Sequence, residues 1–380
     1  MPVPVQKHKF NDDLLLKEED QKHAATRYPA ISHVLDNPEL RTLFSDYDEG
    51  AKRAKIIGRR TGLVAIILVF FALALAASEH LLGEEKANQA FWTFPTILAL
   101  LSGFFGLLGV IIGGIGVLHS EKKRRWLQSR LMTERIRQFH FQTFVCRLPD
   151  IFESLKGPVS KQAFAEKRAL WLDHFKAGYI GKLDSQFTDI IEEENGQDIW
   201  LHEKLPPFDF TESDQLQPLF EAYRELRIEH QIGYANYKLQ NDPTLFTDAP
   251  RSQAAFLSTT GLACIVLLCA IHFFVLLGVL IRWTGAPLSG WMSLQPVVTV
   301  TSIWIALGAL AMRAVEEGLQ PEREIERYQQ YRSAVRAIRD RFDTATSQSE
   351  KVRIMQEMER LSFDEMRNFL ITNDRSRFVM

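Results

Sequence analysis

Four long apolar stretches interrupt an otherwise polar chain of 380 residues. The clearest one runs from Thr96 to Leu118, contains no charged residue and is followed by a basic cluster that begins at Lys122. At about 1.5 Å of rise per residue, a helix of this length crosses a hydrocarbon core of about 30 Å. The other three stretches are Thr61–Ala77, Ala254–Ile281 and Val297–Met312. We predict that all four are membrane-spanning helices.

Glycines follow one face of the second stretch. Gly109 and Gly113 form a G-x-x-x-G pair, and Gly106 extends the same face. In lipid, small residues at this spacing allow the backbone of another helix to approach closely. We therefore predict that Gly106, Gly109 and Gly113 form a helix-packing face.

The charges that flank the stretches predict their orientation. Basic residues precede Thr61–Ala77 and follow Thr96–Leu118, whereas the loop between them carries Glu79, Glu84 and Glu85. Positively charged loops are retained in the cytoplasm, so the first pair of stretches begins and ends there. The second pair also crosses twice. We therefore expect both termini of this multi-pass chain to be cytoplasmic.

Helical periodicity dominates the polar segments, and neither strand alternation nor a βαβ rhythm is present. Tyr328, Tyr331, Val335, Ile338 and Phe342 keep a heptad-like spacing, which predicts a helix that packs along a partner. The fold class that follows is an all-α membrane protein with four transmembrane helices, arranged as two hairpins, and a cytosolic helical bundle. The expected divisions are residues 1–55, 56–120, 121–250, 251–315 and 316–380.

Two further patterns refine this architecture. Ser347 with Glu350, and Ser362 with Glu365, have the spacing of capping boxes and predict the starts of two short helices. When the two pairs of apolar stretches are aligned, Glu134–Phe139 falls on Glu326–Tyr331. We interpret this similarity as a duplicated unit of two spans followed by a cytoplasmic helix.

Composition and motifs exclude several classes of function. The formal net charge of -2 leaves any site for a polyanion to a local patch. The three cysteines form no C-x-x-C pair, and neither His nor Cys clusters at metal-ligand spacing, so we expect no metal and no cofactor. The motifs of phosphate-binding loops, zinc proteases and serine hydrolases are absent from the sequence. We therefore expect that the protein is not an enzyme.

Arginine and aromatic residues recur together near the ends of the apolar stretches. A nucleotide or oligonucleotide needs basic groups for its phosphates and aromatic faces for its bases. Such charges also anchor spans at lipid headgroups, and aromatic residues on a helical stripe often fill a core. The candidate ligand-binding residues are Arg137, His140, Arg224, Arg227, Tyr234, Arg332, Arg336 and Arg339.

Polar residues inside the third and fourth stretches are candidates for a pore lining: His272, Thr299, Thr301 and Ser302. An ionisable residue within a span is a functional candidate by default. The alternative is that the hydroxyls bond to carbonyls of their own helix and that the imidazole bonds a neighbouring helix. Four spans do not readily enclose a wide pore, so a channel requires a homo-oligomer. We expect a tetramer.

Two segments resemble a known family. The run Tyr223–Tyr234, which leads toward a span, and the tail Glu326–Leu370 are similar to the SLATT family, here in a duplicated form. These are two-transmembrane effectors of bacterial nucleotide-signalling anti-phage systems. The resemblance implies an oligomeric ion channel of the bacterial inner membrane that is gated by a nucleotide or single-stranded oligonucleotide. It also implies a nucleotidyltransferase partner encoded nearby, and membrane depolarisation that ends in abortive infection.

A second hypothesis belongs to a different class of function. The same apolar hairpins and charged helices suit a non-conducting membrane-anchored scaffold or a signalling protein of the toxin–antitoxin type. Both hypotheses place the chain in contact with membrane lipid. An ion current in response to a ligand distinguishes the first hypothesis from the second.

Overall fold

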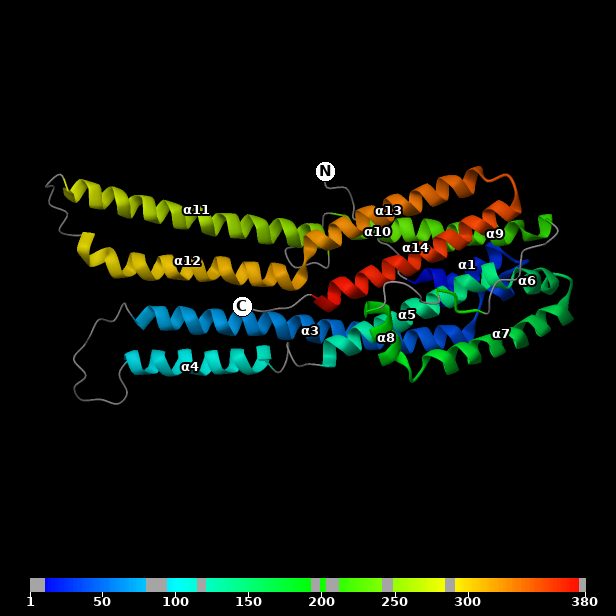
Figure 1. Cartoon of the computed structure of the whole chain (residues 1–380), viewed down its shortest axis with the longest axis horizontal. Coiled ribbons are helices and arrows are strands. Elements are labelled where there is room, and N and C mark those ends of the chain that lie inside the picture. The colour runs from blue at the N-terminus through cyan, green and yellow to red at the C-terminus, as the bar shows by residue number, and fades with distance from the viewer. Residues whose placement is uncertain are drawn as a thin grey trace. The chain divides into compact units, whose positions relative to one another are not determined.

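The computed structural model describes residues 11–79, 94–114, 121–192, 199–202, 212–240, 249–283 and 291–375. Within these ranges the regular structure is helical and no strand occurs, so the predicted all-α class is confirmed (Figure 1). The acidic loop residues Glu84 and Glu85, and the end of the second apolar stretch at Leu118, lie outside the described residues.

Within the described ranges, four helices are long and apolar enough to cross a membrane, in agreement with the predicted number of spans. They are α3 (Pro38–Ser78), α4 (Phe94–Gly113), α11 (Pro250–Trp283) and α12 (Trp291–Leu319). Pro296, which directly precedes the predicted fourth stretch, lies inside α12, so the helix begins before that stretch does. Proline removes only one backbone donor, and near the start of a helix that loss does not stop the apolar run.

The chain forms two compact units, which we call unit 1 and unit 2. Unit 1 comprises Met1–Ala54, Arg124–Gln240 and Ile325–Arg375. Unit 2 comprises Lys55–Lys123, Asn241–Glu324 and Ser376–Met380. The helix α3 is continuous and contributes residues to both units.

In unit 1, α5 (Glu121–Cys146) is the core helix. From Leu131 to Cys146 every side chain except Glu134 is buried. A helix that is covered on all sides needs other helices around it. These are α1 (Glu18–Arg27), α2 (Ser32–Leu35), α6 (Leu148–Ser154), α7 (Pro158–Tyr179), α8 (Leu183–Glu192), α9 (Gln217–Tyr223), α10 (His230–Lys238), α13 (Pro321–Thr344) and α14 (Gln348–Arg375), with the short turns η1 (Asp12–Leu14) and η4 (Asp214–Leu216).

The predicted packing face of α13 is confirmed, because all five of its heptad-like side chains are buried. The capping boxes gave mixed results. Ser347 accepts a hydrogen bond from the backbone N–H of Glu350 at 3.1 Å, at the start of α14. The second predicted start, at Ser362, is wrong because Ser362 is buried in the middle of α14. The apolar periodicity of α14 continues through this position, and its packing overrides the local capping signal.

In unit 2 the helix α3 lies between α4 and α12, while α11 packs on α12 (Figure 1). Two carbonyls of α3 receive hydrogen bonds from its neighbours. Ser102 of α4 donates to Ala72 at 2.9 Å, and the indole of Trp304 of α12 donates to Ala74 at 2.9 Å. The four helices thus form a row in which α4 and α11 are the outer members. Most of the apolar side chains on these two helices are exposed.

Candidate functional site

Two of the predicted ligand-binding clusters meet at one contact in unit 1, which we call the seam. The seam joins α13 to the segment formed by α9, a π-helical turn η5 (Arg224–Glu229) and α10. At one end Phe342 packs near Tyr223, and at the other the hydroxyls of Tyr234 and Tyr328 are 3.4 Å apart. The two clusters were separate in sequence, and helix packing brings them together.

Four arginines lie on or near the seam, and we call Arg224, Arg332, Arg336 and Arg339 the surface arginines. Arg224 donates two hydrogen bonds to the carboxylate of Asp343, at 2.6 and 2.8 Å. Arg332 donates to the side-chain oxygen of Asn236 at 3.2 Å. Arg339 donates to Asp340 at 2.8 Å, whereas the side chain of Arg336 is exposed.

The ion pair between Arg224 and Asp343 is partly exposed to solvent. The side chains of Arg224 and Asp343 are 39% and 38% exposed. Exposed ion pairs contribute about 0–1 kcal/mol each, because water and salt screen them. A phosphate group can therefore exchange with these carboxylates at small cost, which makes the surface arginines the accessible part of the predicted ligand site.

A second group of predicted residues, Arg137, His140 and Arg227, lies in the interior instead. The guanidinium of Arg227 is 2% exposed and donates to both carboxylate oxygens of Glu359, at 3.0 and 2.8 Å. Tyr223 donates to the same Glu359 carboxylate at 2.8 Å. We assign Arg227 a structural role in this conformation, because its charge is already paired and solvent does not reach it.

Arg137 belongs to the same interior network. Its Nε donates to Asp13 at 2.8 Å, and its Nη1 donates to both oxygens of Glu134 at 2.9 Å. These carboxylates outweigh the effect of burial, which by itself lowers the pKa of Arg137, and raise it. Arg137 was predicted to bind a ligand, but in this conformation its guanidinium is buried and already paired.

His140 is enclosed by aromatic rings on α5. Phe141 and Phe144 pack edge-on against its imidazole, with centroids 5.0 Å away in each case. Burial lowers the pKa of His140 to about 3, so the ring is neutral at physiological pH. A neutral, covered imidazole does not attract a phosphate from solution.

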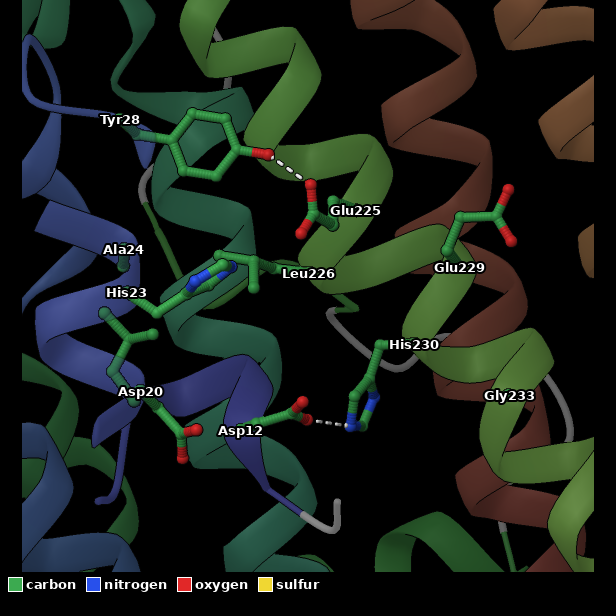
Figure 2. Close-up of a pocket in the computed structure, with 11 residues that line it drawn as sticks. Asp12, Asp20, His23, Ala24, Tyr28, Glu225, Leu226, Glu229, His230 and Gly233 are labelled. Atoms are coloured by element: carbon green, nitrogen blue, oxygen red, sulfur yellow. Dashed lines mark hydrogen bonds and ion pairs between the residues drawn. The ribbon is translucent and has the colours of Figure 1, made fainter. Parts of the chain in front are cut away.

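A cavity of about 300 Å³ opens beside the π-helical turn. It is lined by η1, α1, the turn and the start of α10 (Figure 2). Asp12 and His230 form an ion pair across one wall, with Oδ1 and Nε2 2.8 Å apart, and Tyr28 donates to Glu225 at 2.6 Å on another. No arginine or lysine lines the cavity among the described residues, so the cavity does not by itself suit an anion.

Sequence reasoning missed four acids that organise this region: Asp12, Asp13, Glu134 and Glu359. The only sequence signal was Asp12-Asp13 directly before the apolar cluster Leu14–Leu16. Such a pair usually lies in solvent, so the pattern alone does not reveal a buried acid. His230 is a further residue that the sequence analysis did not single out, and the structure places it beside the two carboxylates of Asp12 and Asp13.

The predicted pore-lining residues do not share one face. Thr299 and Thr301 are both exposed on α12, but residues two apart on a helix point in different directions. Thr299 donates to the carbonyl of Gln295 at 3.0 Å, and Ser302 donates to that of Val298 at 2.8 Å. These are bonds within one helix, so the two hydroxyls do not require a pore.

His272 of α11 is exposed, and its Nδ1 lies 2.8 Å from the carbonyl oxygen of Leu268 one turn earlier. That bond makes Nδ1 the donor and leaves Nε2 as an acceptor on the outer surface of the helix. Within a bilayer such an acceptor favours water or another helix over lipid. His272 therefore remains the strongest of the predicted pore-lining residues.

The predicted glycine face lies against the first span. A Cβ atom at Gly109 would be 2.8 Å from Cγ2 of Val69 and 3.2 Å from its backbone nitrogen. At Gly106 the nearest atom would be Cβ of Ala72 at 3.6 Å, and at Gly113 it would be Cβ of Ala65 at 3.7 Å. The close approach of α3 and α4 thus depends mainly on Gly109.

Comparisons with protein-family models, with curated proteins and with solved structures found no match. Any assignment of function therefore depends on the residues themselves.

Proposed function

We propose that this chain is the membrane effector of an anti-phage defence system, a homo-oligomeric ion channel gated by a nucleotide or oligonucleotide. The observation that carries the proposal is the helix α3. Its first turns place Leu40 and Phe44 in the core of unit 1, and the same helix places Ile66 in the core of unit 2. A change in unit 1 that moves this helix acts directly on the membrane spans.

The proposed topology follows from this arrangement. Unit 1 is the cytosolic bundle, with both termini in the cytoplasm of a bacterium, and unit 2 lies in the inner membrane. The pairs α3–α4 and α11–α12 are the two hairpins of a duplicated unit, and α5 and α13 are the helices that follow them. The similarity between Glu134–Phe139 and Glu326–Tyr331 supports the duplication.

The row of spans in unit 2 supports an oligomer. A single row has two open sides and encloses no pore, so a conducting path needs several copies of the chain. The exposed apolar surfaces of α4 and α11 face lipid or another copy. We propose a tetramer with His272 near the conducting path.

The surface arginines are the proposed entry point of the ligand, which a neighbouring nucleotidyltransferase would make. Arg336 is exposed, and Arg224 and Arg339 have acid partners at the surface that a phosphate can replace. Tyr234 adds an aromatic ring that is partly buried at the end of the seam. Exchange of Asp343 for a phosphate at Arg224 loosens the contact of α13 with the turn η5, and α13 follows the fourth span along the chain.

The test measures current through purified full-length protein in planar bilayers, with and without single-stranded oligonucleotides. We expect the ligand to change the open probability of wild type. Arg336→Glu with Arg339→Glu should abolish this response, while the matched reversal Arg353→Glu, at an exposed position of α14, should preserve it. Absence of current from wild type under every ligand condition would overturn the proposal that the protein is a channel.

The second candidate is a non-conducting scaffold, and one observation favours it. Thr299, Ser302 and His272 all bond to carbonyls of their own helices. Under this alternative, cells that express the protein keep their membrane potential when the ligand is supplied, although unit 1 still binds its partner. Measurement of the potential with a voltage-sensitive dye distinguishes the two candidates in cells.

A further inference from the structure

The turn η1 inserts two acids into the interior of unit 1. Asp13 is fully buried, and its Oδ2 accepts a hydrogen bond from Nε of Arg137 at 2.8 Å. Asn11 accepts from Nη2 of the same guanidinium at 2.6 Å. His230 stands between the two acids, with Nε2 2.8 Å from Asp12 and Nδ1 3.9 Å from Asp13. We call Arg137 and His230, the groups that hold these acids, the cradle.

The acids of η1 balance the charge of the surrounding network. Arg130, Arg137 and Arg227 supply three positive charges, and protonated His230 supplies a fourth. Glu134 and Glu359 supply two negative charges from α5 and α14 through direct ion pairs. Asp12 and Asp13 supply the other two. Without η1 the buried guanidinium of Arg137 keeps Glu134 as its acid partner and loses Asp13, and an added anion can take the place of that carboxylate.

The carboxylate of Asp13 does not fill the cradle completely. Its Oδ1 has no hydrogen-bond partner, and neither has Nε2 of His140, in the part of the chain that the structure describes; both atoms are buried. Asp13 and His140 lie close enough for their charges to interact, since Asp13 acts to raise the pKa that burial of His140 lowers. When Nε2 of His140 carries the ring proton, an oxygen of a bound anion that reaches this nitrogen satisfies a buried donor that Asp13 leaves unpaired.

The backbone of η1 favours its exchange. Asn11 and Leu15, which flank the turn, have left-handed φ values of 65° and 53°. For leucine this conformation is unusual and strained, because its Cβ approaches the following carbonyl. The contacts of Asp12, Asp13 and the buried Leu14 side chain offset this strain only while η1 stays inserted.

The cavity of Figure 2 gives access to the outer layer of the cradle. Asp12 and His230 line the cavity, so solvent reaches their ion pair without any movement of the chain. Asp20, Glu225 and Glu229 line the remaining walls and repel a free anion from the cavity itself. An anion is therefore held only in the cradle behind Asp12, after η1 has withdrawn.

We propose that the cradle is a phosphate-binding site which Asp12 and Asp13 occupy from within the chain, and that a phosphate group replaces them when η1 withdraws. The identity of the phosphate as part of the regulatory ligand rests on the proposed function. The existence of the site rests on the geometry of Arg137, His230 and Asp13.

The experiment removes the internal ligand and offers inorganic phosphate in its place. Full-length Asp13→Ala in detergent micelles should unfold at a lower temperature than wild type, because it leaves Arg137 underpaired. Sodium phosphate should reverse most of this decrease in the midpoint temperature of unfolding, whereas sodium chloride at equal ionic strength should not. Wild type and the control Asp20→Ala, which changes a cavity acid outside the cradle, should gain no phosphate-specific stabilisation.

A second variant keeps the test valid if Asp13→Ala does not fold. Asp13→Asn preserves the size of the side chain, and it should bind radiolabelled pyrophosphate about tenfold more tightly than wild type. Adding Arg137→Met to either variant should remove the phosphate effect. Equal effects of phosphate and chloride on Asp13→Ala, or equal pyrophosphate binding by wild type and Asp13→Asn, would overturn the proposal.

These outcomes are independent of conduction. A chain that binds phosphate in the cradle but never conducts contradicts the proposed function alone. A conducting chain without a phosphate effect on the Asp13 variants contradicts the cradle alone.

Discussion

Two sets of arginines in unit 1 come from the same kind of sequence pattern and have opposite surroundings. Arg137 and Arg227 are enclosed and pair with Asp13 and Glu359 respectively, two carboxylates that solvent does not reach. Arg224 and Arg339 pair with acids at the surface. The buried set fixes how the helices pack, while the surface set can exchange its partners. Only the second set is ready to meet a ligand in this conformation.

The largest expected effect is on the buried set. Arg227→Met leaves Glu359 buried without its guanidinium partner and removes the charge that also faces Tyr223. Breaking one side of a buried ion pair costs about 3–5 kcal/mol. We expect a correspondingly large loss in the free energy of unfolding, measured by denaturant titration in detergent micelles.

The double variant Arg227→Met with Glu359→Met is the control. It removes both charges, so it should recover a large part of the lost stability. Arg353→Met, on the exposed surface of α14, should change stability by less than about 0.5 kcal/mol. A loss below about 1 kcal/mol for Arg227→Met alone would show that the interior pair is solvated, and the contrast between the two sets would disappear.

Unit 2 contains a similar contrast, between a tightly packed glycine and one with free space around it. A methyl group at Gly109 meets Val69, whereas nothing lies within 4 Å of one at Gly103. Overpacking a close contact costs about 1–3 kcal/mol. Gly109→Ala should therefore destabilise the protein by this amount in a thermal unfolding assay. Gly103→Ala should be neutral or slightly stabilising, because alanine is the better helix former.

Part of the fold could be predicted from the sequence. Periodicity and length were enough for the all-α class and the four spans, because those signals are local. The heptad-like stripe of α13 was correct for the same reason. The capping box at Ser362 failed because tertiary packing extended α14 across it.

The candidate site was less accessible to such reasoning. The pattern of arginines and aromatic rings did not distinguish Arg227 from Arg224, which are three residues apart on the π-helical turn. Which of them is buried depends on Glu359, a residue distant in sequence. The role of Asp13 was equally hidden, because its partner Arg137 lies on another helix.

A smaller effect concerns the pH dependence of stability. It involves His230, which lies in the wall of the cavity. Burial alone lowers its pKa, but Asp13 and Asp12 outweigh burial and raise the pKa above 6.5. The stabilisation from protonated His230 is thus complete below about pH 6.5, and it is lost as the pH rises through the folded-state pKa. Each unit of pKa elevation contributes about 1.4 kcal/mol.

The opposite limb of the pH profile comes from the acids. Positive neighbours, chiefly Arg137 for Asp13 and Arg130 for Glu134, outweigh burial and lower the pKa values of these carboxyls. Their stabilisation is present above about pH 4.5 and is lost as the pH falls. Wild type should be most stable between these limits. His230→Gln should lose the decline above pH 6.5 and keep the decline in acid, as measured by thermal midpoints across the pH range.

The smallest expected effect tests the surface set. Arg224→Ala removes a bidentate contact with Asp343, but both side chains are more than a third exposed. We expect a cost of about 0–1 kcal/mol that shrinks further in high salt. A double-mutant cycle with Asp343→Ala measures the coupling energy directly. A coupling above about 2 kcal/mol would mean that the seam is as fixed as the interior. In that case a phosphate could not exchange with its carboxylates, and the surface arginines would no longer qualify as the entry point of a ligand.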